Sequence, residues 1–500
     1  MGGGTSSGRA SIPRAKILAT YRAGPEAIAS LIQYLQDLHE AELGELRAMI
    51  DTLSQQVKQL QEQLHSDSHN SSKPPSSDGP ARRPYMKREK SKRKPGGQPG
   101  HEGTTLRRTV TPDEVVVHRA TRCRCGHSLR PQPVEGYTKR QVFEIPRLSL
   151  KVTEHQAEIK RCPACGRASQ GQFPPEVKRA VQYGANLRSY VIYLKDYTLI
   201  PYQRLRQLMK DLFGVPLSSA TLFAAEQQCA RGLKDTVQQI RREIVAAAVG
   251  HFDETGLRVQ GKVSWLHSAS TKTATYYQVH PRRGTQAMDA MGVLGAFAGV
   301  AVHDGWSSYA RYGKLHGLCN AHHLRELTFL WEEGQQRWAQ LLARELCRWK
   351  RLVDRAKDRG QKHLSAVTVR SIEWWYHHLV HMGMRANPPP AIAQTSRRGR
   401  KKRGKAGSLV DRLWENRDHV LRFVHDFRVP FDNNLAERDL RMMKVQQKIS
   451  GTFRSWEGVE AFATVRSYIS TIRKRGTNVI EAIASVFEGK PLLPAAPVSC

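Results

Sequence analysis

Two aspartates occupy positions from which their carboxylates could act together. By the two-residue period of a β-strand, Asp253 shares a face with His251, and Asp304 shares a face with Val302 at the end of an apolar run. Carboxylates held close together raise each other's pKa, so stability alone does not favour such a pair. A single aspartate at a strand end is more often a turn former or a helix cap. Two aspartates whose carboxylates lie close together could jointly bind a hard divalent cation such as Mg²⁺.

The segments around these aspartates indicate how the chain would bring them together. The patterns predict, in order, a strand through Asp253, a turn at Gln260 and Gly261, strands at Val263–His267 and Ala274–His280, a helix near Thr285–Leu294 and a strand at Gly299–Gly305. Three meandering strands, a helix and one more strand are the order of an RNase H-like core. In that order the first and fourth strands are neighbours, so we expect Asp253 and Asp304 to meet.

A third acid is expected on a helix farther along the chain. Asp432 is the predicted N-cap of this helix, and Glu437 lies in its first turns. Arg441 and Lys444 follow on the same face as Glu437. Such a row is usually a surface ladder of ion pairs. Here it would also place a metal ligand beside cations that bind a phosphate backbone.

Two close pairs of cysteines have the spacing of metal ligands: Cys123, Cys125, Cys162 and Cys165. A strand-like hairpin between the pairs, with alternating residues at 148–153, would bring four thiolates into the tetrahedral cage that a structural Zn²⁺ prefers. The first pair is tighter than the usual spacing, so His127 could replace one thiolate as a ligand. Two unrelated pairs of reduced cysteines are the alternative.

The charge of the chain points to a polyanionic partner. Lysine and arginine number 79 against 45 acidic residues, which gives a formal net charge of +34 at pH 7. Nucleic acid is the leading candidate for such a partner. The Pro-, Ser- and Gly-rich segment 67–108 is expected to be a basic disordered arm, or only a solvated linker. Its candidate phosphate contacts are Lys87, Arg88, Lys90, Lys92, Arg93 and Lys94.

A heptad seam precedes this arm. Apolar residues from Leu46 to Leu64 follow one another at alternating spacings of four and three. This period favours a self-associating coiled coil, although a single amphipathic helix packed on its own protein is the alternative. Farther along, 204–229 has the outline of a helix–turn–helix. Such helix pairs are common in ordinary cores, so we do not expect this one to bind DNA sequence-specifically.

Taken together, these segments resemble the IS66-family transposases over nearly the whole chain. The resemblance is carried by the zipper-like helix, the paired cysteines and the motifs His69–Asp78, Gly96–His101, Asp253–Gly256, His303–Trp306, Cys319–His322 and Asp432–Arg438. It implies a DDE transposase whose acidic triad is Asp253, Asp304 and Glu437. The long gap between the second and third acids fits a helical insertion. The tight first cysteine pair is the one departure from the family's pattern.

The resemblance also implies cofactors and partners. Two Mg²⁺ or Mn²⁺ ions would bind at the triad, and one structural Zn²⁺ would bind at the paired cysteines. The partners would be double-stranded DNA, as element ends and as target, a second copy in a homodimer or higher assembly, and accessory proteins encoded by the element. By the same resemblance, the expected location is the bacterial cytoplasm. No apolar run reaches the roughly 18 residues that span a membrane.

Cys319 and His322, followed by His323, resemble a Cys-x-x-His signature of several DDE lineages. The group could bind a metal, but two ligands do not make a zinc site. We therefore favour a structural role, in which the buried side chains brace the following helix against the catalytic strands.

The predicted fold class is multidomain α/β, with an RNase H-like core interrupted by a helical insertion. The expected order is a flexible leader (1–25), a coiled-coil helix (26–66), the basic linker (67–108), a zinc-ribbon-like domain (109–175), a helical segment (176–245), the core (246–330 and 430–490) around the insertion with its basic loop (331–429), and a tail (491–500). Two other functions fit part of this pattern: a non-enzymatic zinc-ribbon DNA-binding regulator, and an RNase H-like nuclease.

Overall fold

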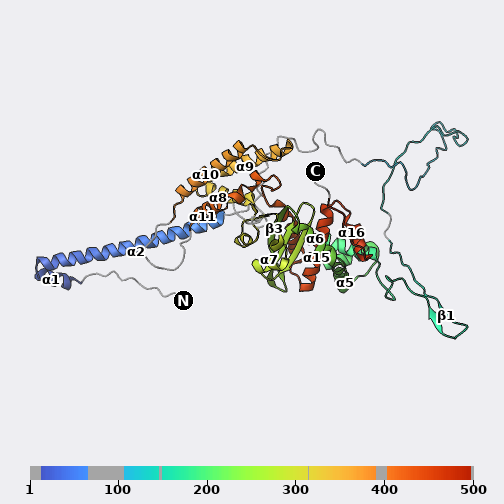
Figure 1. Ribbon diagram of the computed structural model, residues 1–500, viewed down its shortest axis with the longest axis horizontal. Coiled ribbons are helices and arrows are strands. Elements are labelled where there is room, and N and C mark those ends of the chain that lie inside the picture. Colours follow the sequence, from blue (N-terminus) through green and yellow to red (C-terminus); the bar gives the residue numbers. More distant parts are fainter. Residues whose placement is uncertain (1–12, 66–105, 146–148, 314, 390–402, 497–500) are drawn as a thin grey trace. The chain divides into compact units, whose positions relative to one another are not determined.

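The computed structural model describes residues 13–65, 106–145, 149–313, 315–389 and 403–496 (Figure 1). The chain divides into two compact units. We call them the helical unit (1–85, 322–348 and 374–414) and the sheet unit (86–321, 349–373 and 415–500). The six candidate phosphate contacts of the basic arm, from Lys87 to Lys94, lie outside the described residues.

The helical unit begins with α1 (Arg14–Arg22) and α2 (Pro25–His65), which are separated by Gly24 in a left-handed conformation. Helix α1 lies where the sequence predicted a flexible leader. The single long α2 contains the whole predicted seam. The seam residues Leu46, Leu53 and Leu60 have 54, 54 and 59% of their surface exposed, so the apolar stripe lies open.

Four more helices contribute to the helical unit: α8 (Asn320–Glu332), α9 (Arg337–Asp358), α10 (Ala366–Ala386) and α11 (Lys405–Glu415). Gly383 of α10 allows them to approach closely, because a Cβ there would lie 2.9 Å from the Trp338 ring and 3.0 Å from Val410. The Tyr376 hydroxyl donates to the Leu413 carbonyl at 2.7 Å and joins α10 to α11. Helices α9, α10 and α11 lie in the segment 331–429 where the sequence predicts an insertion, whereas α8 lies almost wholly in the predicted first part of the core, 246–330.

The sheet unit is built on a mixed sheet of five strands: β3 (Val249–Val259), β4 (Lys262–Ser270), β5 (Thr275–His280), β6 (Val300–His303) and β7 (His316–Leu318). Their spatial order is β5-β4-β3-β6-β7. The first three strands are antiparallel neighbours, whereas β6 runs parallel to both β3 and β7. Gln260 and Gly261 both have positive φ, so they form the predicted two-residue hairpin turn.

Helices cover both faces of this sheet. One face, with Phe252, Ala269 and Tyr276, belongs to a core cluster that includes α6 (Lys234–Val245). The opposite face, with Leu257 and Tyr277, clusters with Leu440 and Met443 of α14 (Asn434–Ser450). Residues of α15 (Trp456–Lys474) join both clusters. Because Asp253 shares its strand face with Leu257, it lies on the side that α14 covers.

Further helices belong to the sheet unit: α3 (Ala185–Ile192), the π-helical turn at Tyr193–Tyr197, α4 (Tyr202–Phe213), α5 (Ser219–Gly232), α7 (Thr285–Met291), α12 (Arg417–Val420), α13 (Arg422–His425) and α16 (Val479–Phe487). The predicted helix–turn–helix outline is present as α4 and α5. Gly214 ends α4 in the left-handed conformation, and Ser218 caps α5 by accepting the Thr221 N–H at 3.0 Å.

The chain leaves the sheet after β7 and returns to the same place before α14. The Asn320 N–H donates to the Phe431 carbonyl at 3.0 Å, and the Asn320 side chain donates to the Val420 carbonyl at 3.0 Å. Residues 100 and 111 positions apart in the sequence are therefore held side by side at the exit and re-entry point.

The cysteine region contains a small hairpin of β1 (Ile159–Arg161) and β2 (Ala168–Gln170), which flanks the second cysteine pair. The sequence predicted a strand at 148–153. The structure describes 149–153 of this segment, and these residues form no strand, so the prediction is wrong there. Backbone pairing occurs instead next to the tight turn that the cysteine pair itself forms.

Candidate catalytic site and cysteine turns

Asp253 and Asp304 lie beside each other on neighbouring strands. In the parallel pairing of β3 with β6, Val249 lies opposite Val300 and His251 opposite Val302. Continuing this register by two residues places Asp253 opposite Asp304, which directly follows β6. The expectation that the first and fourth strands are neighbours is confirmed.

Glu437, in the first turn of α14, completes a group of three acids. Burial raises the pKa of Asp253 well above its ordinary value, and the nearby carboxylates of Glu254, Asp304 and Glu437 raise it further. The Glu254 N–H donates to Asp253 Oδ1 at 2.9 Å, and the Trp306 N–H donates to Asp304 Oδ1 at 2.9 Å. The three acids predicted from the sequence therefore interact electrostatically at one end of the sheet.

The N-terminal end of α14 is fixed by Asn433. Its Nδ2 donates to the Phe252 carbonyl at 2.8 Å, beside Asp253, and its Oδ1 lies 2.9 Å from His251 Nδ1. The backbone N–H of Asn433 donates to Cys319 Sγ at 3.2 Å. The predicted N-cap, Asp432, is wrong by one residue: Asn433 is the cap, and Asp432 accepts the Asn434 N–H at 3.1 Å in the preceding turn.

Farther along α14, two polar side chains hold the helix against β3. Gln447 Nε2 donates to the Gly256 carbonyl at 2.8 Å, and Lys444 Nζ lies 3.5 Å from the same oxygen. Burial lowers the pKa of Lys444, and the carboxylate of Asp253 opposes this shift. Arg441 and Lys444 both remain exposed, so their positive ends line the helix that carries Glu437.

A second buried acid, Glu254, was not anticipated from the sequence. Its side chain is 1% exposed, and Oε1 accepts from Arg283 Nε at 3.0 Å and Nη2 at 2.7 Å. Oε2 accepts from the Tyr309 hydroxyl at 2.6 Å. The Arg283 guanidinium lies 4.2 Å from the ring centre of Trp306 and 4.9 Å from that of Trp265. The sequence signal was only that Glu254 follows Asp253.

Cys319 lies next to this acidic group. Cys319 is fully buried, and its Sγ and a Glu437 carboxylate oxygen lie within 4.8 Å of each other. His322 and His323 follow in the first turn of α8. Burial lowers the pKa of His323 to about 3, so that residue is neutral at pH 7. Cys319, which directly follows β7, thus contacts the start of α14, and the choice between a metal-binding and a bracing role stays a prediction.

Each pair of the other four cysteines forms a tight turn of its own. The Cys123 N–H donates to the His127 carbonyl at 2.9 Å, and the Cys162 N–H donates to the Arg167 carbonyl at 2.8 Å. Hydrogen bonds from neighbouring backbone N–H groups lower the pKa of Cys123 and of Cys162, which favours the thiolates that bind metals. Among the described residues, these four sulfurs do not form a group within 4.8 Å.

The sheet unit holds three interacting acids at one strand end and follows two cysteine turns, and comparison with family models identifies the class of protein. The model of the transposase IS66 family matches residues 180–461, more than half of the chain. The chain therefore belongs to the IS66 family of transposases. A model of the zinc-finger binding domain of IS66 transposases matches 120–166, and a family of unknown function matches 22–107.

No curated protein matched the chain. Among the described helices, none combines the length and apolar character that a membrane crossing requires. The family resemblance predicted from the motifs is confirmed, and so is the presence of the family's zinc-finger domain. DNA transposition is the activity that the family implies, and DNA is the partner.

Proposed function

We propose that this transposase cuts and joins DNA with a DDE triad formed by Asp253, Asp304 and Glu437. The observation that carries the proposal is the β3–β6 register, which places Asp253 opposite Asp304 at one sheet end, with the Glu437 carboxylate near enough to raise the pKa of Asp253. The strand order β5-β4-β3-β6-β7, with β6 parallel to β3, is the order expected of an RNase H-like core. A cluster of like charges costs stability, so a function must account for it.

The donor set fits hard divalent cations. Three carboxylates offer the oxygen ligands that Mg²⁺ and Mn²⁺ prefer. Asp253 would contact two ions, and Asp304 and Glu437 would hold one each. When bound, such ions activate the attacking oxygen and stabilise the leaving oxygen of a phosphodiester.

The chain's own cations would orient the DNA. Arg441 and Lys444 are exposed on α14, near the triad, and would bind backbone phosphates. The basic arm from Lys87 to Lys94, outside the described residues, would add affinity that falls as salt rises, because each bound phosphate releases counterions.

The paired cysteines would bind one structural Zn²⁺. Each pair already lies in a backbone turn, and the family's zinc-finger model covers all four residues. Binding would draw the two turns together into a zinc-ribbon-like domain. Metal analysis of freshly purified protein should find about one zinc per chain. Cys162→Ser should remove that zinc and leave the thermal unfolding of the catalytic core unchanged; zinc-free wild type would contradict the assignment.

Helix α2 would join two copies of the chain. Its seam residues Leu46, Leu53 and Leu60 are more than half exposed, and burying them in a coiled coil would remove that surface from water. Joining two element ends also requires two active sites, which a dimer supplies. A coiled coil of about three heptads gives only a marginally stable dimer by itself. We therefore expect the dimer to be more stable when it is bound to DNA.

The deciding experiment is a joining assay with duplexes taken from the DNA that flanks this gene in its own element. We expect Mg²⁺-dependent cleavage of the ends and their transfer to a target plasmid. Asp304→Asn and Glu437→Gln should each abolish both steps while binding of end DNA survives. Cleavage without transfer would favour the RNase H-like nuclease, and binding without cleavage would favour the regulator.

The same assay tests the dimer. Leu53→Lys with Leu60→Lys places unpaired charges in the seam, so light scattering should show monomers and paired-end joining should fall far more than single-end binding. Thr52→Lys with Gln56→Lys adds the same charge outside the seam and should behave as wild type. A dimeric, fully active seam variant would place the interface elsewhere.

A further inference from the structure

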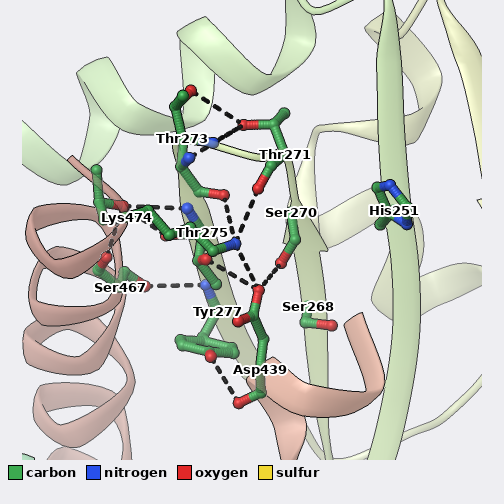
Figure 2. A network of polar contacts seen from close by, with 12 residues as sticks. His251, Ser268, Ser270, Thr271, Thr273, Thr275, Tyr277, Asp439, Ser467 and Lys474 are labelled. Carbon is green, nitrogen blue, oxygen red and sulfur yellow. Dashed lines mark hydrogen bonds and ion pairs between the residues drawn. The ribbon is translucent and has the colours of Figure 1, made fainter. Parts of the chain in front are cut away.

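Asp439 lies two residues after Glu437 and bonds to three other elements (Figure 2). Its Oδ2 accepts from Ser270 Oγ of β4 at 2.7 Å, from Thr275 Oγ1 of β5 at 3.1 Å and from Lys474 Nζ of α15 at 2.7 Å. We call these four residues the Asp439 network. The Asp439 and Lys474 side chains are 16 and 15% exposed, so the network is largely sheltered from water.

The network fixes the middle of α14 from its backbone as well. The Tyr277 hydroxyl donates to the Asp439 carbonyl at 2.7 Å, in addition to the three bonds at the carboxylate. Lys474 Nζ also donates to the carbonyls of Thr271 at 2.9 Å and Ala274 at 3.2 Å, which ties the β4–β5 turn to the end of α15. Figure 2 shows Asp439 reaching from α14 into the space between these elements.

Helical geometry relates this network to the triad. Residues two positions apart on an α-helix point about 200° apart, given 3.6 residues per turn. Asp439 and Glu437 therefore leave α14 on opposite sides, one toward β4, β5 and α15 and the other toward Asp253. Any rotation of α14 that breaks the Asp439 bonds also turns Glu437 away from the other acids.

We propose that Asp439 is a positioning residue for Glu437: it sets the rotation and height of α14 so that the third acid of the triad stays within reach of Asp253 and Asp304. The proposal rests on the proposed catalytic function. Asn433 fixes the start of the same helix and Gln447 its end, and Asp439 holds the turn between them. Its charge also matters, because Lys474 is largely buried and has Asp439 as its carboxylate partner.

The test compares Asp439→Asn with a matched control. Asp411→Asn neutralises a carboxylate of similar exposure, 22%, which pairs with Arg403 in the helical unit. Two quantities are measured: the Mg²⁺ dependence of end cleavage, and the affinity for Mn²⁺ without DNA, from electron paramagnetic resonance. Thermal unfolding and metal-free DNA binding are recorded for each variant.

We expect Asp439→Asn to lower cleavage about 10- to 100-fold and to raise the half-saturating Mg²⁺ and Mn²⁺ concentrations about tenfold, as is usual when support for a metal site is removed. Metal-free DNA binding should stay at the wild-type value, and Asp411→Asn should change none of these quantities. Unchanged metal affinities in a folded Asp439→Asn protein would overturn the proposal.

A purely structural role would lower the unfolding temperature and leave the metal dependence alone. If Asp439→Asn does not fold, Ser270→Ala removes one of the three donors and should shift the metal dependence in the same direction. Failure of the catalytic proposal is separate: Glu437→Gln would then keep wild-type Mn²⁺ affinity, whatever Asp439→Asn does.

Discussion

Carboxylates gather at two places in the sheet unit, and their surroundings differ. Asp196 and Glu226, with side chains 0 and 1% exposed, share the ammonium of Lys195, which lies 2.8 Å from Asp196 Oδ1 and also bonds Glu226 Oε1. Glu226 Oε2 accepts from the Tyr202 hydroxyl at 3.0 Å. In this cluster, buried acids have a buried cation between them.

The triad has the opposite arrangement. Asp253 meets the carboxylates of Asp304 and Glu437, while Lys444, whose charge acts on Asp253, reaches the Gly256 carbonyl instead. The first cluster has its cation within the chain, whereas the second brings carboxyl groups together and, as we propose, takes its cations from outside. Similar residue types therefore serve stability in one place and, as we propose, catalysis in the other.

The largest expected effect separates activity from stability at the triad. Asp253→Asn should lower end cleavage more than about 1000-fold, which corresponds to about 4 kcal/mol in the barrier. The free energy of unfolding without metal should stay the same or rise by about 1 kcal/mol, because the change relieves repulsion among like charges. Urea denaturation and the cleavage assay measure the two quantities. A marked loss of stability would mean that Asp253 supports the fold.

The second-largest effect is a loss of stability at the cluster around Lys195. Lys195→Met keeps the apolar stem but removes the charge, and should lower the free energy of unfolding by about 3–5 kcal/mol, since two buried acids then lack their cation. Urea denaturation in low salt measures the change. Combining it with Glu226→Gln should recover part of the loss. A change below about 1 kcal/mol would show that Lys195 is dispensable.

The smallest effect is a pH dependence at Glu226. Burial raises its pKa to about 7, with Lys195 opposing the shift and Asp196 adding to it. The folded state therefore holds this proton more tightly than the unfolded state, whose pKa is near 4.5. Its contribution to stability is full below pH 4.5 and is lost as the pH rises through 7.

Glu226→Gln remains neutral, so it isolates this contribution. The stability of wild type relative to the variant should fall by an amount on the order of 1 kcal/mol between pH 4.5 and 7.5. Denaturation midpoints at a series of pH values measure the difference. A difference that does not vary with pH would show that Glu226 titrates as it would in water.

Local patterns predicted the parts of the site that lie on regular elements. The period-two face around Asp253, the turn at Gln260 and Gly261 and the order of the strands all depend on near neighbours in the sequence. The meeting of Asp253 with Asp304 followed because parallel neighbours end at the same edge. The actual cap of α14 differed by one residue, since Asn433 is committed to β3.

The long-range polar contacts could not be predicted in this way. Lys195 meets Glu226 across 31 residues, Arg283 meets Glu254 across 29, and Asp439 meets Thr275 across 164. No periodicity or spacing records such partners, because they depend on how whole elements pack. Cys162 and Cys165 show the other limit: their spacing indicates a metal knuckle, but not whether the distant pair joins them.

The hydrogen bond between Asn320 and Phe431 holds the two ends of the intervening chain side by side. Residues 322–348 and 374–414 of this stretch belong to the helical unit, whereas Val420 and Val429 contact the sheet unit. Insertions or deletions confined to the first group would leave the joined ends in place. For the protein engineer, the same feature marks a place where a foreign domain can be spliced into the enzyme.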